Sequence, residues 1–231
     1  MYWTYFPTVG TANIPSDLYI VMPESFSGTV TTTPPLIYTS GAIEWNLDYH
    51  TIDFEIGREI PLTETLSIRP SAGLKAAIIN QSLATSWSDP LIGLHSFGNT
   101  EHDYWGLGPS FGIDGRWGFR PEGGLGLVGS FSGALMNGVW NVTDDFVRGA
   151  ALGIPEESVS TTMHDSSLGT LMFRYFFGLE WTRPGNVSTS VHIGYETQWW
   201  ANQQRITTFQ QLPLHGDLTL QGASCGVTVC F

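Results

Sequence analysis

Apolar and polar residues alternate along most of this chain with the two-residue period of a β-strand. Between Leu66 and Ile78 every second residue is apolar, whereas Arg69 and Lys75 fall on the opposite face. Such runs exceed the five or six residues usual for soluble strands and match the roughly 9–11 that a tilted strand needs to cross a membrane. Similar alternation predicts eight strands, at 2–6, 43–60, 66–80, 104–119, 125–139, 171–181, 187–199 and 217–231.

The second of these segments changes phase along its length. Its apolar residues fall at odd positions from Ile43 to Tyr49 and at even positions from Ile52 to Ile56. One extra residue in a strand exchanges its two faces, so we expect a β-bulge near Thr51.

The connections between the predicted strands alternate in length. Short turns fall at 61–65, 120–123 and 184–186, and long polar loops fall at 8–41, 82–101, 141–167 and 201–216. Short turns on the periplasmic side and long loops outside are typical of membrane barrels. In hydrocarbon every backbone N–H and C=O must be paired within the protein, and among β-structures only a closed sheet achieves this. The pattern therefore predicts one domain, residues 1–231, that is all-β: a transmembrane antiparallel up-and-down β-barrel of about eight strands.

Large aromatic residues lie near the ends of the predicted strands. Amphipathic rings favour the headgroup layers of a bilayer, so two aromatic belts are expected on a barrel that crosses one. The interface girdle that we predict consists of Trp45, Trp105, Trp117, Trp140, Trp181, Trp199 and Phe231. An aromatic residue that ends an alternating last strand also resembles the signal by which outer-membrane proteins reach the barrel-insertion machinery, which makes Phe231 the expected contact.

Composition narrows the class of protein further. The chain has 231 residues, of which 42% are hydrophobic and only 13% charged, so we expect lipid to cover part of its surface. No run of 18 apolar residues predicts a membrane helix. A net charge of −12 with nine Lys and Arg argues against nucleic-acid binding. The residues after Met1 do not form a signal peptide, so for an exported chain we expect a leader upstream.

Charged residues within the strands fall opposite the apolar face and would line the lumen. Eight strands enclose a space just wide enough for side chains, so mixed charges there form either a narrow pore or a plug of ion pairs. Acidic loops would favour cations at the mouth, which predicts a weak cation preference. The expected lumen-lining residues are Asp53, Glu55, Arg69, Lys75, Asp114, Arg116, Arg174, Glu180, His192 and Glu196.

Two other classes of function are alternatives to the pore. His102-Asp103, His164-Asp165 and Asp48 near His50 would lie at the outer rim, where some outer-membrane hydrolases carry their catalytic residues. Neighbouring residues of a strand point to opposite faces, and no nucleophile motif or metal spacing accompanies these pairs, so we predict no catalytic residue, metal or cofactor. A closed barrel that displays adhesive loops is the other alternative.

The two cysteines lie in the last predicted strand. Cys225 and Cys230 are five residues apart, which in an extended chain places them on opposite faces and too far apart to bond to each other. They are either small half-buried residues or sites of disulfide cross-links between chains, as in a homo-oligomer.

Several segments together resemble a known family. Asp53-Phe-Glu-Ile-Gly-Arg58, Arg69-Pro-Ser-Ala-Gly-Leu-Lys75, Trp105-Gly-Leu-Gly-Pro109, Gly194-Tyr-Glu-Thr-Gln-Trp199 and Asp217-Leu-Thr-Leu-Gln-Gly222 are similar to the pore-forming, major-outer-membrane-protein-like family of Legionella and chlamydia-related bacteria. The resemblance covers about residues 43–231. It implies an integral outer-membrane barrel that forms a pore, and at least one further strand before the segment that matches 2–6.

Overall fold

A computed structural model describes residues 2–14, 40–120, 123–151, 156–183, 188–206 and 214–230. Every element within these ranges is a β-strand. The strands are β1 (Tyr2–Ile14), β2 (Ser40–Gly57), β3 (Ile60–Pro61), β4 (Leu66–Asp89), β5 (Leu94–Gly118), β6 (Gly124–Arg148), β7 (Glu157–Arg183), β8 (Ser188–Ile206) and β9 (Leu214–Cys230). Among the described residues no helix is long and apolar enough to span a bilayer.

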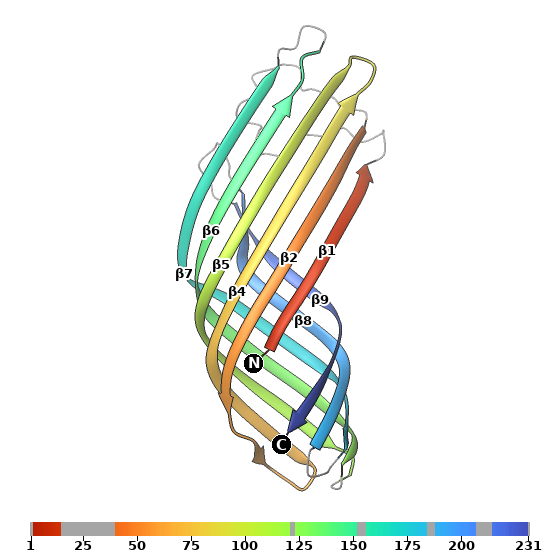
Figure 1. Cartoon of the computed structure of the whole chain (residues 1–231), viewed down its shortest axis with the longest axis vertical. Coiled ribbons are helices and arrows are strands. Elements are labelled where there is room, and N and C mark those ends of the chain that lie inside the picture. Colours follow the sequence, from red (N-terminus) through yellow and green to blue (C-terminus); the bar gives the residue numbers. More distant parts are fainter. Residues whose placement is uncertain are drawn as a thin grey trace.

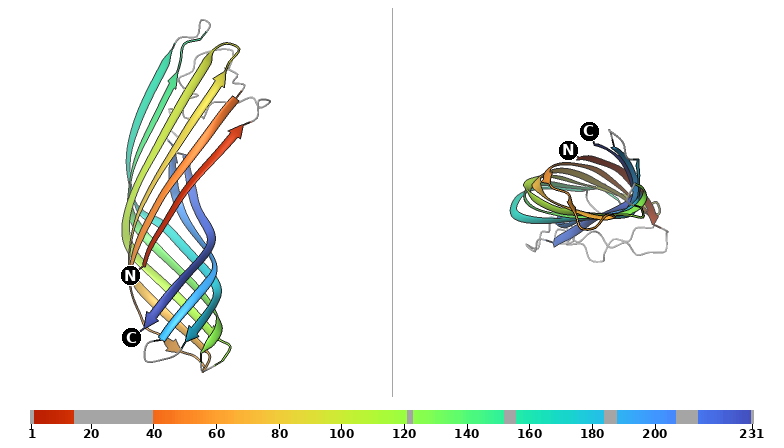
Figure 2. Two further views of the ribbon diagram at one scale, coloured as in Figure 1. Left: turned by 45° about the vertical axis from the view of Figure 1, so that its right-hand side comes forward. Right: turned by 90° about the horizontal axis from the view of Figure 1, so that it is seen from below.

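The strands form one antiparallel sheet in the order β1-β2-β4-β5-β6-β7-β8-β9, with the short β3 paired to β4. This meander confirms the predicted all-β fold with its eight long strands. The sheet curls into a half-barrel in its lower part, and β2 and β4 to β7 continue upward as a curved sheet (Figures 1 and 2). Within the described residues the edge strands β1 and β9 share no ladder of backbone hydrogen bonds.

The strands are longer than predicted, at the expense of the loops. The predicted loop 82–101 is a turn at 90–93 between β4 and β5, and most of 141–167 belongs to β6 and β7. Those two loop predictions are wrong because Ser, Thr, Asn and Asp, which are common in turns, here occupy the solvent-facing side of strands. Of the predicted loops 8–41 and 201–216, residues 8–14, 40–41, 201–206 and 214–216 are strand; 15–39 and 207–213 lie outside the described residues, as does Phe231.

No bulge occurs in β2, so that prediction is also wrong. β2 pairs with both neighbours in continuous register, and Leu47, Tyr49, Thr51 and Asp53 are all buried on one face. The apolar residues change sides because the surroundings of the sheet change along its length. The register instead shifts between Met136 and Asn137, and between Trp200 and Gln204.

We divide the outward face of the sheet into two regions. The first, the apolar belt, is the lower region and is bounded on β5 by Trp105 and Trp117. Its outward side chains include the exposed Phe54, Ile78, Leu107, Phe111, Ile113, Tyr175, Phe177, Leu179, Trp181, Ile193, Tyr195 and Val227.

The second region, the extension, comprises residues 40–48, 80–89, 94–103, 141–148 and 157–165. Its outward face is mainly polar, with Asn, Asp, Glu, Ser and Thr in cross-strand rows. Its inward face carries buried apolar residues such as Trp87, Leu94 and Phe146. The belt and the extension therefore have opposite polarity.

Close strand packing requires glycine at position 73. A Cβ added there would lie 1.9 Å from the backbone oxygen of Phe54, whereas one added at Gly222 would meet nothing within 4 Å. We expect Gly73→Ala to lower the free energy of unfolding by about 1–3 kcal/mol, because β2 must move away from β4. Urea unfolding in detergent micelles measures the change. Gly222→Ala is the matched control, and an equal loss in both variants would contradict the steric argument.

Candidate functional site

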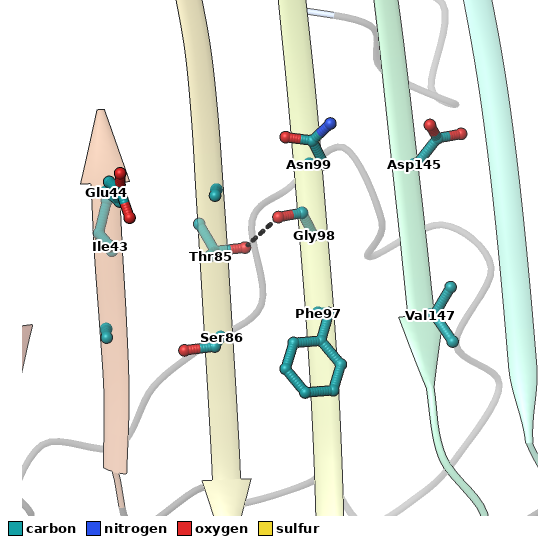
Figure 3. A pocket seen from close by; sticks show the side chains of 11 residues that line it. Ile43, Glu44, Thr85, Ser86, Phe97, Gly98, Asn99, Asp145 and Val147 are labelled. Atoms are coloured by element: carbon teal, nitrogen blue, oxygen red, sulfur yellow. Dashed lines mark hydrogen bonds between the residues drawn. The ribbon is translucent and has the colours of Figure 1, made fainter. Parts of the chain in front are cut away.

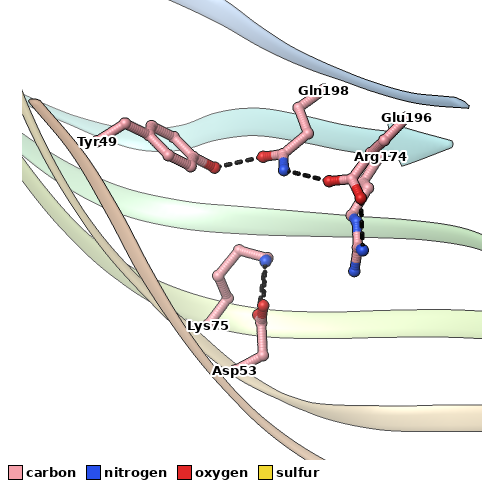
Figure 4. A network of polar contacts seen from close by, with 6 residues as sticks. All are labelled: Tyr49, Asp53, Lys75, Arg174, Glu196 and Gln198. Atoms are coloured by element: carbon pink, nitrogen blue, oxygen red, sulfur yellow. Dashed lines mark hydrogen bonds and ion pairs between the residues drawn. The ribbon is translucent and has the colours of Figure 1, made fainter. Parts of the chain in front are cut away.

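The inner face of the curled sheet carries ion pairs at the level of the apolar belt. Asp53 of β2 and Lys75 of β4 are direct cross-strand partners, and their Oδ1 and Nζ atoms lie 2.6 Å apart. Both side chains are almost completely buried, with exposed fractions of 7% and 3%. The two charges are therefore compensated mainly by each other (Figure 4).

A second group of polar side chains connects opposite parts of the sheet. Arg174 of β7 and Glu196 of β8 form an ion pair of 2.8 Å, and the Gln198 amide donates a hydrogen bond of 2.6 Å to Glu196. The hydroxyl of Tyr49, on β2, donates to the Gln198 side-chain oxygen. Because β2 and β8 are far apart in the strand order, this bond crosses the interior of the half-barrel (Figure 4).

Two further ion pairs lie nearer the short turns. Arg116 of β5 contacts Glu180 of β7 at 2.6 Å, and Arg69 of β4 contacts Asp114 of β5 at 3.0 Å. The Arg69 pair is more exposed, with fractions of 35% and 41%.

The remaining two predicted lumen residues are Glu55 and His192. Both are half-buried, and the His192 ring lies edge-on to Phe176 at 5.4 Å. Glu55 is in none of the ion pairs found among the described residues. The structure thus places all ten predicted residues on one face; that this face lines a pore stays a prediction.

An aromatic cluster fills the interior above these ion pairs. Tyr49, Tyr104, Trp140 and Trp200 are at most 2% exposed, and the ring centroids of Tyr104 lie 4.8 Å from Trp140 and 6.2 Å from Trp200. Aliphatic residues complete the packing, with Leu47, Ile79, Met136, Val142, Met172 and Leu218 among them. At this level side chains, rather than an open lumen, occupy the space between the strands.

Arg205 packs against one side of the aromatic cluster. Its guanidinium lies 4.2 Å from the centroid of the Trp140 ring and forms a 2.5 Å ion pair with Asp165. The Trp140 indole donates a hydrogen bond of 3.2 Å to the backbone oxygen of Gln203. These contacts join β6 and β7 to the upper end of β8.

The cluster corrects the predicted girdle at two positions. Trp140 is completely buried within it and Trp45 packs against it from the inward face, so both assignments to the membrane interface are wrong. In the upper part of β2 the odd-numbered residues face inward, and in β6 the even-numbered residues do. Trp45 and Trp140 therefore both point into the interior. Trp105, Trp117 and Trp181 are half exposed on the outward face, and Trp199 stacks there on Phe173 at 5.7 Å. Their contact with headgroups stays a prediction.

In two of the three His–Asp combinations, His102-Asp103 and His164-Asp165, the two side chains point to opposite faces of the sheet, whereas Asp48 and His50 share the outward face of β2. His102 points inward while Asp103 points outward, because they are neighbours in β5. His164 contacts Asn141 at 2.6 Å, and Asp165 pairs with Arg205 on the other face. Among the described residues no group of three or more His, Cys, Asp or Glu side chains could hold a metal. Cys225 is a free, exposed thiol on β9.

Burial of His102 predicts a pH dependence of the extension. Burial lowers the pKa of this histidine from 6.5 to about 4, so the folded state takes up its proton only at much lower pH than the unfolded chain. Above pH 6.5 the histidine is neutral in both states, so it does not reduce the free energy of unfolding. As the pH falls toward 4, the unfolded chain binds a proton that the folded state does not, and the free energy of unfolding decreases. We expect the hydrogen-exchange protection factors of 94–104, which remove the intrinsic pH dependence of amide exchange, to fall over that window, and to fall less in His102→Gln. An equal fall in both chains would assign the effect to other groups.

Comparison with known proteins agrees with this architecture. Neither the curated proteins nor the solved structures contain a match to the chain. The family model described as the Legionella pneumophila major outer membrane protein precursor matches residues 1–231, which is the whole sequence. The chain therefore belongs to the Legionella major outer membrane protein family.

Proposed function

We propose that the chain spans the outer membrane and forms a narrow pore for ions and small solutes. Support for the membrane position comes from the height of the apolar belt. Trp105 and Trp117 are separated by roughly 40 Å of strand at about 3.4 Å per residue. At the roughly 45° tilt of membrane strands this corresponds to a height of about 28 Å, close to the ~25 Å apolar band of outer-membrane barrels.

The observation that carries the pore proposal is the charged inner face behind that belt. Burying ionisable side chains at the depth of a bilayer is costly, and where they occur they usually mark an ion or substrate path. Here the inward positions hold Asp53, Glu55, Asp114, Glu180 and Glu196 against Arg69, Lys75, Arg116 and Arg174. Five carboxylates face four cationic groups, so the path carries a slight excess of negative charge.

We infer a weak preference for cations from this excess. Glu55 is the carboxylate left without a cationic partner among the described residues. The outward face of the extension adds Glu44, Asp48, Glu101, Asp103 and Asp145 near one mouth. An acidic mouth raises the local concentration of cations.

Planar-bilayer recording of the full chain tests the proposal. We expect small single-channel currents and a reversal potential, in a KCl gradient, that indicates preference for K⁺. Glu55→Gln should reduce the ratio of K⁺ to Cl⁻ permeability, because it removes the uncompensated carboxylate. Glu59→Gln is the matched control, since Glu59 is exposed and lies beyond the end of β2. No current from correctly folded protein would refute the pore.

A second candidate is a closed barrel that anchors the extension at the cell surface. The aromatic cluster favours it, because buried rings occupy the interior where a path would have to pass. In that case the protein conducts no ions, and its surface sheet carries the function. Binding of the purified chain to host cells, measured alongside conductance, distinguishes the two candidates.

A further inference from the structure

A hollow opens on the outward face of the extension, across β2, β4, β5 and β6. Its volume is about 540 Å³, within the range typical of small-molecule sites. Two neighbouring cross-strand rows border it, one of Ala42, Ser86, Phe97 and Val147 and one of Glu44, Ala84, Asn99 and Asp145 (Figure 3). The surface is hollowed because Ala42, Ala84 and Ser86 are small, whereas the side chains around them are larger.

The hollow combines an exposed ring with planar polar groups. Phe97 is 58% exposed and Val147 is 40% exposed, although they lie on a face that is otherwise mostly polar. Asn99 donates a hydrogen bond of 3.1 Å to Glu101, and Asn46 donates one of 3.4 Å to Glu44. The carboxylates of Glu44 and Asp145 retain lone pairs that can accept further hydrogen bonds.

This set of groups matches the surface of a neutral sugar. A pyranose has an apolar C–H face that packs on an aromatic ring, and hydroxyl groups at its edge that donate to carboxylate and amide oxygens. Phosphate and other anions fit poorly, because no Lys or Arg lines the hollow and two carboxylates do. A lysine-rich peptide would match the charge, but its side chains offer no flat apolar face to pack on the Phe97 ring.

The position of the hollow indicates where such a sugar would come from. Phe97 lies on the same face as Trp105, separated by about 27 Å of strand at about 3.4 Å per residue. With the roughly 45° tilt of membrane strands, this places the hollow about 19 Å above the edge of the apolar belt. The extension lies at the end of the strands opposite the short turns, which membrane barrels place in the periplasm, so it stands in the layer that the sugar chains of the outer-leaflet glycolipid occupy.

We propose that this hollow binds a neutral hexose unit in the sugar chain of the outer-leaflet glycolipid. Phe97 provides the stacking surface, and Glu44, Asn99 and Asp145 bind the hydroxyl groups. The proposal rests on the membrane position given under the proposed function, but it does not require that the barrel conducts. Binding would tie the extension to the membrane surface on which it stands.

Titration of the full chain in detergent with sugar tests the proposal. The probe is the oligosaccharide released by mild acid from the glycolipid of the producing bacterium, and saturation-transfer NMR reports contact. We expect Phe97→Ala to weaken binding about tenfold, which corresponds to about 1.4 kcal/mol, because the apolar face of the sugar loses the ring on which it packs. Asp145→Asn should weaken it less. Leu91→Ala is the matched control, because Leu91 is exposed in a turn and does not line the hollow.

Three outcomes would overturn the proposal: no binding by the parent chain, equal binding by Phe97→Ala, or competition by octa-lysine but not by the oligosaccharide. Retained binding of host-cell glycans with no binding of the bacterial oligosaccharide would also overturn it, because it assigns the wrong source. Single-channel conductance of Phe97→Ala, which leaves every charge of the mouth in place, is recorded in parallel. Unchanged conductance with lost sugar binding supports the proposal, and the pore proposal can fail without affecting this result.

Discussion

Lys75→Met is expected to lower the free energy of unfolding by about 3–5 kcal/mol, the usual cost of removing one partner of a buried ion pair. Asp53 and Lys75 are 7% and 3% exposed, so the remaining carboxylate would stay buried beside a methyl group. The double variant Asp53→Leu/Lys75→Met should recover most of the loss, because apolar replacement of both partners is often close to neutral. Urea titration in detergent, followed by tryptophan fluorescence, measures each step.

Arg69→Met is the matched control for this pair. Arg69 also pairs across neighbouring strands, with Asp114, but the two side chains are 35% and 41% exposed. Water screens such a pair, and exposed pairs contribute only about 0–1 kcal/mol. A small loss in Lys75→Met that is no larger than in Arg69→Met would show that water reaches Asp53, which would also favour an open path.

The alternation of residues was sufficient to place the cross-strand ion pairs on one face. Asp53 and Lys75 both fall opposite the apolar residues of the belt, and the structure makes them direct partners. The contact between Tyr49 and Gln198 could not be predicted in this way, since 149 positions separate them in the chain and no local pattern relates them. Contacts across the interior depend on how strongly the sheet curls.

Changes in surroundings explain the predictions that failed. In a membrane barrel the apolar side of a strand faces out, and in a soluble sheet it faces in. β2 follows the second rule at Leu47 and the first at Phe54, so one strand shows both patterns without a bulge. The same reversal explains why the upper parts of β5 and β6 are predicted as loops. Their apolar residues, such as Phe146, face inward, and their polar residues face outward. A change of phase with unbroken register is therefore a signal for the edge of the apolar belt.

The aromatic cluster leads to the second large effect. Trp200 is completely buried and contacts both tyrosines, with ring centroids 5.9 Å from Tyr49 and 6.2 Å from Tyr104. We expect Trp200→Ala to lower the free energy of unfolding by about 3–5 kcal/mol, as other buried Trp truncations do. If the barrel is a pore, the same change removes a ring from the level where buried side chains fill the interior, and single-channel conductance should rise above that of the parent chain.

Trp105→Ala is the matched control, because Trp105 is 52% exposed on the outward face and does not enter the interior. It should leave conductance unchanged. Trp200→Leu keeps the cluster apolar and should fold more readily than Trp200→Ala while still enlarging the path. If both Trp200 variants fold and conduct no better than the parent chain, the cluster does not limit a pore. Its buried rings then belong to the packed core of a closed anchor, and the outward face of the extension becomes the surface where function is to be sought.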